Sequence, residues 1–408
     1  MSAWDLGRAE EHLLSLELFG MRFGLERMRR LLTALGSPQE RFRAVHVVGT
    51  NGKSSTVRFT AALLEAHGIR TGAYLSPHLT TFAERIRVGD NDLSGPEFGA
   101  AIQRAAAAAA MVDRTGDGDR VTQFELLTAA ALDELARREV EVAVVEAGLG
   151  GRWDATNVLG ADVVVLTNVG LEHTRWLGPT IADIAGEKLA VVKPGATLVL
   201  GDSSPEVAAL AAQTGATIVR PEPVEIDLPA YQRRNFATAF AAANFEAGSD
   251  PCGAGDVASL FDRGLTPMSL QVPGRFQVVD HEPLTILDGA HNAPGIAALA
   301  GSVPEGTVAV VSILDDKDAA EMLRALLPRL SAAVFTRAPN PRALSPATLA
   351  DLASKVGGVA SEIEPDPRRA VERARALAGR NGTVLATGSI YLVADLLSAP
   401  GERRASAL

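Results

Sequence analysis

The chain has 408 residues, of which 47% are hydrophobic and 22% charged, and its formal net charge is −10 at pH 7. A chain of this length exceeds the size at which one hydrophobic core keeps growing, so we expect two domains. The acidic balance argues against a broad surface for nucleic acid or an anionic membrane. The single cysteine, Cys252, excludes an intramolecular disulfide framework and a multi-cysteine metal site.

The sequence also bears on where the protein works. No apolar run approaches the length that spans a bilayer, and the first residues, MSAWDLGRAEEH, lack the pattern of a secretory signal. Both observations and the single cysteine lead us to expect a cytoplasmic enzyme with no membrane or nucleic-acid partner. We further expect a monomer.

The first predicted element is an amphipathic helix whose apolar face carries Leu25, Met28, Leu31, Leu32 and Leu35. The stretch 45–59, VHVVGTNGKSSTVRF, follows it. An apolar run ends on Gly49, and Lys53 then opens a helix that begins with hydroxyl side chains. A strand, a glycine-bearing turn and a helix N-terminus form a cradle for phosphate, in which a lysine reaches the terminal phosphates and a hydroxyl can ligate Mg²⁺.

The spacing of this loop differs from the usual Walker A pattern, because Val47 stands where that pattern has a glycine. The plain alternative is a lysine at a helix start that has no ligand. We nevertheless predict phosphate binding at this loop.

Beyond the loop, strands and helices alternate in two sets, which is typical of parallel sheets covered by helices. The first set has predicted strands at 71–75, 142–145, 163–167, 197–200 and 217–219, and helices at 96–112, 122–138, 181–192, 205–213 and 231–247. The second has strands at 284–287, 308–313, 332–335 and 384–387.

The predicted fold class is therefore α/β: a P-loop-containing parallel-sheet ATPase domain followed by a smaller Rossmann-like C-terminal domain. The polar, proline-bearing stretch 280–283 is interpreted as the linker, which divides the chain into residues 1–279 and 280–408.

Ligands of open α/β sheets bind beyond the carboxyl ends of the strands, so polar residues there are candidate site residues. Glu146 ends the run VAVV, and an acid in that place commonly holds the Mg²⁺ of a nucleotide, although it could also cap the next turn. His173 follows the next strand and could ligate the same metal, and Ser76 could add a hydroxyl oxygen.

Lys188 lies within an otherwise apolar helical run, IADIAGEKLAVV. A lysine there must pair, extend to solvent or lose its charge, and a structural ion pair is the plain interpretation. In the second set, Asp288 ends the strand LTIL and precedes GAHN, which suits contact with a ribose or a phosphate. Arg275, little more than a dozen residues earlier, could grip phosphate with its fork. The nucleotide would then lie between the domains.

Seven motifs occur in the order of one known family: GTNGKSS, SPHL with ERIRV, VVEAGLGGRWDATNV, EHTRWLG, the EK pair, PGRFQ and LDGAHN. Together they resemble the folylpolyglutamate synthase and dihydrofolate synthase branch of the Mur ligase superfamily, from about Gly24 to Tyr391. The resemblance implies an ATP-dependent amide ligase. A substrate carboxylate takes the γ-phosphoryl group of ATP, and the amine of L-glutamate then attacks the acyl phosphate. Dihydropteroate, reduced (tetrahydro)folates or both would be the acceptors.

The resemblance also assigns residues at the nucleotide. The triphosphate loop would be Thr50, Asn51, Gly52, Lys53, Ser54 and Ser55, and Ser54 replaces the glycine that the family usually has after the lysine. The Mg²⁺ ligands would be Ser55, Ser76, Glu146 and His173. Lys188 matches a lysine that is carbamylated in the family and could then hold a second ion. Further ATP contacts would be Asn235, Arg275, Asp288 and His291.

For the pterin, the resemblance implies a pocket formed by two segments and a loop at its mouth. These carry Thr122, Gln123, Phe124 and Glu125, then Trp153, Asp154 and Ala155, and the loop Arg22, Phe23 and Gly24. Phe124 can stack on a pterin and Asp154 can accept its amino hydrogens. The plain alternative is that Phe124 is a core residue and Asp154 a helix cap.

Three alternatives stay open at this point. The chain could carry only one of the two family activities. It could be a Mur-type ligase for another carboxylate, such as a peptidoglycan precursor. It could also be a nucleotide-binding regulatory module without ligase activity. Glutamate itself has no assignable motif.

Overall fold

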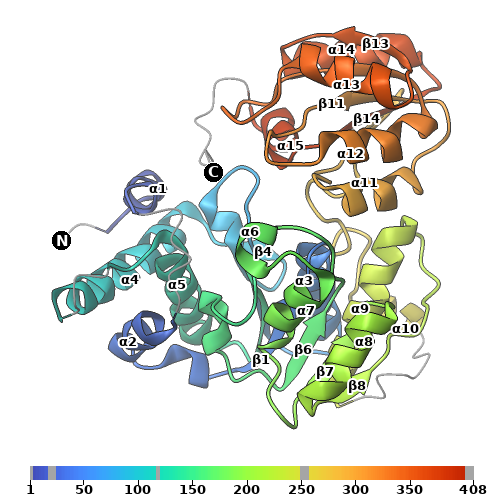
Figure 1. Cartoon of the computed structure of the whole chain (residues 1–408). Coiled ribbons are helices and arrows are strands. Elements are labelled where there is room, and N and C mark those ends of the chain that lie inside the picture. The colour runs from blue at the N-terminus through green and yellow to red at the C-terminus, as the bar shows by residue number, and fades with distance from the viewer. Residues whose placement is uncertain (1–2, 17–23, 116–119, 249–256, 400–408) are drawn as a thin grey trace.

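The computed structural model describes residues 3–16, 24–115, 120–248 and 257–399. Phe23 and its neighbour Arg22, predicted at the pocket mouth, and Cys252 lie outside the described residues. The described chain contains two sheets, each covered by helices on both faces, as Figure 1 shows. This arrangement confirms the predicted α/β class.

The first sheet has eight strands in the order β4-β3-β2-β5-β1-β6-β7-β8. The strands are β1 (Arg43–Val48), β2 (Thr71–Tyr74), β3 (Ile86–Val88), β4 (Asn91–Asp92), β5 (Val142–Glu146), β6 (Val163–Leu166), β7 (Thr197–Leu200) and β8 (Thr217–Val219). Six of them run parallel, and the β3–β4 hairpin extends the sheet antiparallel at the β2 edge.

Two helical layers cover this sheet because its strands are apolar on both sides. One layer contains α1 (Leu6–Leu14), α2 (Glu26–Ala34), α4 (Gly95–Thr115), α5 (Gln123–Arg137), α7 (Ile181–Leu189) and α8 (Pro205–Ala211). The other contains α3 (Lys53–Ala66), α9 (Ala230–Glu246) and α10 (Val257–Asp262). In β1, Val45 and Val47 pack against the second layer, whereas Ala44 and Val48 pack against the first.

The second sheet has six strands in the order β13-β12-β11-β14-β10-β9, and only β9 is antiparallel. Its strands are β9 (Gln277–His281), β10 (Leu284–Leu287), β11 (Thr307–Val311), β12 (Leu330–Phe335), β13 (Ala360–Ile363) and β14 (Thr383–Thr387). Its helices are α11 (Ala293–Ala300), α12 (Ala319–Leu326) and α13 (Pro346–Val356) on one face, and α14 (Pro367–Ala378) and α15 (Ile390–Leu397) on the other.

Three elements of the sheets escaped the sequence patterns. The β3–β4 hairpin and β9 are short or exposed, and β13 alternates weakly between its two faces, so none has the buried apolar run that marks the other strands. The stretch 280–283, which is predicted to be the linker, contains the end of β9 and the turn of the β9–β10 hairpin. We therefore propose that the division between the two units lies shortly before Gln277.

In Figure 1 the second unit, orange to red, lies over the carboxyl-end edge of the first sheet, and α11 contacts α9. The short helix α6 (Thr174–Leu177) lies at this edge as well. None of the described helices is long and apolar enough to cross a membrane.

Candidate active site

The loop between β1 and α3 needs glycine at two positions. Gly49 has φ +150°, and a Cβ there would lie 1.9 Å from the Thr167 hydroxyl oxygen. Gly52 has φ +83°, and its Cβ would lie 2.4 Å from Oδ1 of Asn235. A side chain at either position would be strained and would collide with its neighbour. The loop therefore folds closely against β6 and α9, and its conformation is set by the sequence GTNG.

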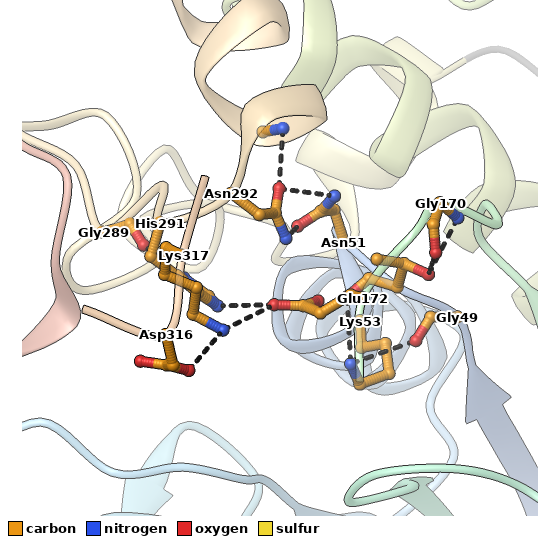
Figure 2. Close-up of polar contacts among 12 residues, drawn as sticks. Gly49, Asn51, Lys53, Gly170, Glu172, Gly289, His291, Asn292, Asp316 and Lys317 are labelled. Carbon is orange, nitrogen blue, oxygen red and sulfur yellow. Dashed lines mark hydrogen bonds and ion pairs between the residues drawn. The ribbon is translucent and has the colours of Figure 1, made fainter. Parts of the chain in front are cut away.

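Lys53 lies at the first position of α3 and bends back over the loop. Its Nζ donates hydrogen bonds to the carbonyl oxygens of Gly49 and Thr50, both at 3.2 Å (Figure 2). The free N–H groups of the first helical turn and this ammonium group form a positive cradle that favours an anion. The geometry is that of a phosphate-binding loop, as the strand–turn–helix pattern predicts.

Glu146 lies at the end of β5, opposite the loop, and is only 1% exposed. Its Oε1 accepts a hydrogen bond from the Ser54 hydroxyl at 3.0 Å, and its Oε2 accepts one from the Ser76 amide at 3.1 Å. Burial raises the pKa of Glu146, and the nearby ammonium of Lys53 opposes this shift. A buried carboxylate at a cleft wall that accepts a hydroxyl hydrogen bond and forms no ion pair with the described residues suits a divalent cation, which prefers oxygen ligands.

His173 precedes α6 in a left-handed conformation, with φ +53°. His173 is exposed at the edge of the cleft, and partial desolvation together with the positive charge of Lys317 and Lys53 lowers the pKa of the imidazole below its ordinary value. The imidazole is therefore neutral near pH 7 and can offer a lone pair to a metal. Among the described residues, no three His, Cys, Asp or Glu side chains cluster as a metal site. Glu146 and His173 could therefore hold a metal only if the serine hydroxyl oxygens complete its ligands.

Lys188 does not lie in the wall of the cleft. It lies behind the loop, 2% exposed, and its Nζ donates to the carbonyl oxygen of Gly49 at 2.9 Å. No carboxylate of the described chain is within ion-pair distance, so the plain interpretation of a structural ion pair is wrong. Burial, and to a smaller extent Lys53, lower the pKa of Lys188 from 10.5 to about 7.

The second sheet contributes Asp288, and Arg275 lies just before its first strand, β9. Asp288, at the end of β10, is 2% exposed, and its Oδ2 accepts from the Tyr231 hydroxyl at 2.6 Å and from the Phe276 amide at 2.8 Å. Tyr231 belongs to α9, so this bond joins the two units. The Arg275 guanidinium lies against Gly289, where a Cβ would be 2.3 Å from Nη1. Both Asp288 and Arg275 face the first unit's loop.

Two further groups of contacts join the units beside the loop (Figure 2). Glu172 accepts from Lys317 Nζ at 3.3 Å and lies 3.4 Å from Nε2 of His291. These neighbours hold the pKa of Glu172 well below its usual range despite its burial. The amides of Asn51 and Asn292 exchange two hydrogen bonds, at 2.9 and 3.2 Å, and Asn292 also caps α11. The second unit is thus attached directly to the phosphate loop.

Two cavities open at this edge. The first, the phosphate-loop cleft, has a volume of about 580 Å³. Its walls include the predicted nucleotide and metal residues other than Lys188, namely Thr50, Asn51, Gly52, Lys53, Ser54, Ser55, Ser76, Glu146, His173, Asn235, Arg275, Asp288 and His291. The second, the aromatic cavity, has about 400 Å³. The two share a wall made of Ser76, Pro77, Gly148, His173 and His291.

The aromatic cavity contains every described residue that was predicted to contact a pterin. They are Gly24, Thr122, Gln123, Phe124, Glu125, Trp153, Asp154 and Ala155. Two of the carboxylates are already bonded. Glu125 accepts from the Thr122 amide and from Arg27 Nε at 2.8 Å, which fixes the start of α5. Asp154 accepts from the amides of Leu149 and Thr156, both at 3.0 Å.

Sequence reasoning missed several residues that the structure places at the cavities. Lys317 and Glu172 follow the carboxyl ends of β11 and β6, so the strand-end rule could have found them. Tyr231 and Trp176 lie on helices, and Arg85 directly precedes β3. Trp176 and Arg85 belong to the motifs EHTRWLG and ERIRV, whereas no motif includes Tyr231, and only the tertiary fold brings the three to the cavities.

Comparison with known proteins agrees with this geometry. Residues 47–279 match the Mur ligase middle domain, and residues 274–390 match the Mur ligase, glutamate ligase domain. The chain is 32% identical to the dihydrofolate synthase/folylpolyglutamate synthase of Bacillus subtilis, over 93% of this chain and 95% of that protein. It is 34% identical to a probable bifunctional folylpolyglutamate synthase/dihydropteroate synthase of Haloferax volcanii, of which it spans about half, 49%.

Solved structures give the same result. The folylpolyglutamate synthase of Mycobacterium tuberculosis complexed with ADP superposes with a TM-score of 0.87 at 28% identity, covering 98% of this chain and 99% of that one. E. coli FolC in complex with DHPP and ADP gives a TM-score of 0.83 at 29% identity, covering 96% and 97%. The chain therefore belongs to the folylpolyglutamate synthase/dihydrofolate synthase branch of the Mur ligase family, whose members are ATP-dependent ligases that form amide bonds.

Proposed function

We propose that this chain joins L-glutamate to dihydropteroate, to reduced folates, or to both, and uses ATP to activate the acceptor carboxylate. One observation carries the proposal: the phosphate-loop cleft and the aromatic cavity meet at a shared wall. A nucleotide in the cleft and an aromatic acid in the cavity would bring the γ-phosphorus and the carboxylate together at that wall. Enforced proximity of this kind supplies a large part of the rate of a transfer reaction.

The reaction has two steps. An oxygen of the acceptor carboxylate bonds to the γ-phosphorus, the bond from this phosphorus to the β–γ bridging oxygen breaks, and ADP leaves. The nitrogen of L-glutamate then bonds to the carbonyl carbon of the acyl phosphate. The carbon–oxygen bond to the phosphoryl group breaks, phosphate leaves, and the amine loses a proton to solvent. Neither step needs a nucleophilic side chain, so the work of the protein is positioning and charge stabilisation.

The loop residues Thr50 to Ser55 would hold the phosphates with their N–H groups, and Lys53 would neutralise charge on the transferring phosphoryl group. Asn235, Arg275 and Asp288 would contact the rest of the nucleotide, with His291 near the phosphates. Asn235 already packs on Gly52, so it would hold the nucleotide and the loop together. These roles are supported by the walls of the cleft.

Magnesium would supply charge neutralisation at the phosphates when it is bound. Ser55, Ser76, Glu146 and His173 are the residues that would hold it, since all four line the cleft. Ser54 hydrogen-bonds Glu146, and this contact would orient the carboxylate. A relative from Yersinia pestis is described with Mn, AMPPNP and L-glutamate bound, which supports a divalent ion at an equivalent site. We propose magnesium in this chain, with two ions.

Lys188 would be N6-carboxylated and would hold the second ion. Its lowered pKa supports this, because an uncharged amine is the form that reacts with carbon dioxide. Its position behind Gly49 requires the side chain to leave the Gly49 carbonyl oxygen when it takes on the negative charge.

In the aromatic cavity, Phe124 would stack on the pterin and Asp154 would accept hydrogen bonds from its amino group. Trp153, 38% exposed, would form the outer wall with Ala155 and Gly24. Thr122 and Glu125 would act indirectly, because their side chains hold the start of α5. L-Glutamate would approach from the wall of the second unit, where Lys317 could meet one of its carboxylates. We further propose a cytoplasmic monomer without nucleic-acid or membrane partners.

The test is an assay of ADP release with ATP, Mg²⁺ and L-glutamate, and with dihydropteroate or tetrahydrofolate as acceptor. Mass spectrometry of the product separates one activity from two, because each ligation adds one glutamate. Turnover with only one acceptor would identify a monofunctional enzyme. Absence of ADP release with both acceptors would reject the proposal and favour a ligase for another carboxylate or a binding module. Chelation of Mg²⁺ by EDTA should stop ADP release in either case.

A further inference from the structure

Arg85 is a buried cation that forms no ion pair with any described residue. It directly precedes β3 and is 3% exposed, and no carboxylate of the described residues is within ion-pair distance of it. The neighbouring Glu84 is engaged elsewhere, since its oxygens accept the amides of Leu79, Thr80 and Thr81. A guanidinium that is buried without a carboxylate costs several kcal/mol of folding free energy. Proteins keep such a group when a ligand supplies the missing charge.

The guanidinium is held in place by neutral groups. Its Nε donates to Nδ1 of His78 at 2.9 Å, and its Nη1 donates to the Ser76 hydroxyl at 3.4 Å. Its Cζ lies 5.2 Å from the centre of the Phe82 ring, which also packs on His78. Burial and the guanidinium itself keep the pKa of the His78 imidazole well below its ordinary value, so His78 is uncharged and accepts the hydrogen bond without supplying a negative charge. The fork is therefore rigid and still positively charged.

The location of Arg85 tells which ligand would meet it. The residue lines the aromatic cavity, and its hydrogen-bond partner Ser76 belongs to the wall shared with the phosphate-loop cleft. The backbone amide of the same Ser76 donates to Glu146 in the cleft. The fork thus lies where the acid end of a ligand in the aromatic cavity would reach the nucleotide. A planar fork matches a planar carboxylate better than an ammonium group does.

We propose that Arg85 binds the carboxylate of the acceptor substrate and so selects an aromatic carboxylic acid for the aromatic cavity. This inference rests on the proposed function and adds to it the residue that recognises the reacting group. The bond forms before phosphoryl transfer and does not need ATP. Arg85 is then a substrate-binding residue, kept at a cost in stability for the sake of recognition.

The test compares dihydropteroate with its decarboxylated analogue, in which hydrogen replaces the carboxyl group on the ring. Binding is measured by quenching of tryptophan fluorescence with ADP present and without glutamate, so no turnover is involved. The wild-type chain should bind the acid about tenfold or more tightly than the analogue, because hydrogen bonds between charged groups are the strong ones. Arg85→Met should bind the two ligands within about threefold of each other.

Thermal melting distinguishes recognition from a structural role. Because Met fills similar space without a buried charge, Arg85→Met should melt at the wild-type temperature or above it. A variant that keeps the tenfold preference overturns the inference. A lowered melting temperature together with an equal loss of affinity for both ligands also overturns the inference. If Arg85→Met does not fold, Arg85→Lys replaces it: the charge stays but the fork is lost, and an unchanged preference for the acid counts against the inference.

Arg87→Met is the matched control. Arg87 lies two residues further along β3, bonds to Asp92, and lines neither the aromatic cavity nor the phosphate-loop cleft, so its loss should leave the preference intact. Failure of the two proposals can be told apart. If the wild-type chain binds neither ligand and shows no turnover, the proposed function fails and this inference falls with it. If the wild-type chain is active and Arg85→Met keeps the preference for the acid, this inference fails while the proposed function stands.

Discussion

The phosphate-loop cleft and the aromatic cavity share a wall but are constructed differently. The loop that we propose binds phosphate in the cleft consists of seven consecutive residues, 49–55, whose conformation follows from two glycines and a helix start. The aromatic cavity is assembled from the start of α5, the loop after β5, and residues of the second unit such as Tyr391. The comparison teaches that backbone recognition of phosphate can be encoded locally, whereas recognition of an aromatic acid depends on distant segments meeting.

Strand β1 serves both sites. The strand ends at Gly49 and the loop. His46, in the middle of the strand, lies on the same side as Ala44 and Val48, which face the helical layer that contains α5. Nε2 of His46 lies 2.8 Å from the Thr156 hydroxyl, which in turn donates to Asp154 at 2.5 Å. The strand therefore supports the aromatic cavity from behind by a buried chain of hydrogen bonds. Four substitutions test this comparison of the two sites.

Lys53→Ala should have the largest effect and should act on the cleft alone. Loss of the ammonium group removes charge stabilisation of the transferring phosphoryl group, so turnover should fall at least a hundredfold, or about 2.7 kcal/mol. Binding of dihydropteroate in the aromatic cavity should stay unchanged, as measured by tryptophan fluorescence. The control is Lys355→Ala on α13, which removes only an exposed pair with Asp351. Unchanged turnover in Lys53→Ala would contradict the mechanism.

His46→Gln should change stability with pH. Burial lowers the pKa of His46 in the folded state from 6.5 to about 4, so the unfolded chain binds a proton first as the pH falls. Folding free energy is therefore lost from about pH 6.5 downward, and His46 should account for about 2 kcal/mol at pH 5 and little at pH 7.5. Urea unfolding at both values should show a smaller loss in His46→Gln, which keeps a donor for Thr156.

The control for this measurement is His281→Gln, an exposed histidine on β9, which should lose as much stability in acid as the wild-type chain. If His46→Gln also follows the wild-type curve, burial of His46 does not carry a cost in acid. The buried support behind the aromatic cavity would then not be a source of pH sensitivity.

Glu172→Gln should affect both sites, because Glu172 joins the two units beside the shared wall. Without its charge, Lys317 and His291 lose their common partner, and kcat/KM for ATP and for the pterin acceptor should both fall about tenfold. Glu321→Gln on α12, which removes an exposed pair with Arg324, is the control. A fall for only one of the two substrates would show that Glu172 serves a single site.

Phe124→Leu should have the smallest effect and should act on the aromatic cavity alone. Loss of ring stacking is worth about 1 kcal/mol, so the KM for dihydropteroate should rise about fivefold while the KM for ATP stays constant. Phe245→Leu at the exposed end of α9 is the matched control. An unchanged KM would support the alternative that Phe124 is a core residue, in keeping with its contact with Tyr74.

The same contrast explains what the sequence predicts well. The buried parallel strands, the phosphate loop and the strand-end residues Glu146 and Asp288 follow from local patterns, and the structure has them at one edge. The stretch 280–283 is interpreted as a linker from the sequence because it is polar and contains a proline, whereas in the structure it holds the end of β9 and a hairpin turn. Arg85 stands in the motif ERIRV, but its lack of an ion pair with a described carboxylate appears only in the tertiary structure.

Lys188 illustrates an intermediate case. Its apolar surroundings on α7 correctly predict that its charge is a problem, and burial indeed lowers its pKa to about 7. The sequence could not tell that the nearest acceptor is the carbonyl oxygen of Gly49, because α7 and the loop are 139 positions apart. Local patterns thus identify a residue under strain, and the tertiary fold identifies what it touches.

The paired amides of Asn51 and Asn292 have one more consequence. Any rotation that withdraws α11 removes Asn292 from Asn51 in the phosphate loop. Binding of a ligand at this loop would therefore be thermodynamically linked to the position of the second unit. Such linkage is reciprocal. A ligand that stabilises the contact between Asn51 and Asn292 must itself bind more tightly, by the same factor, when that contact is formed. Release of the product and separation of the two units would then occur together.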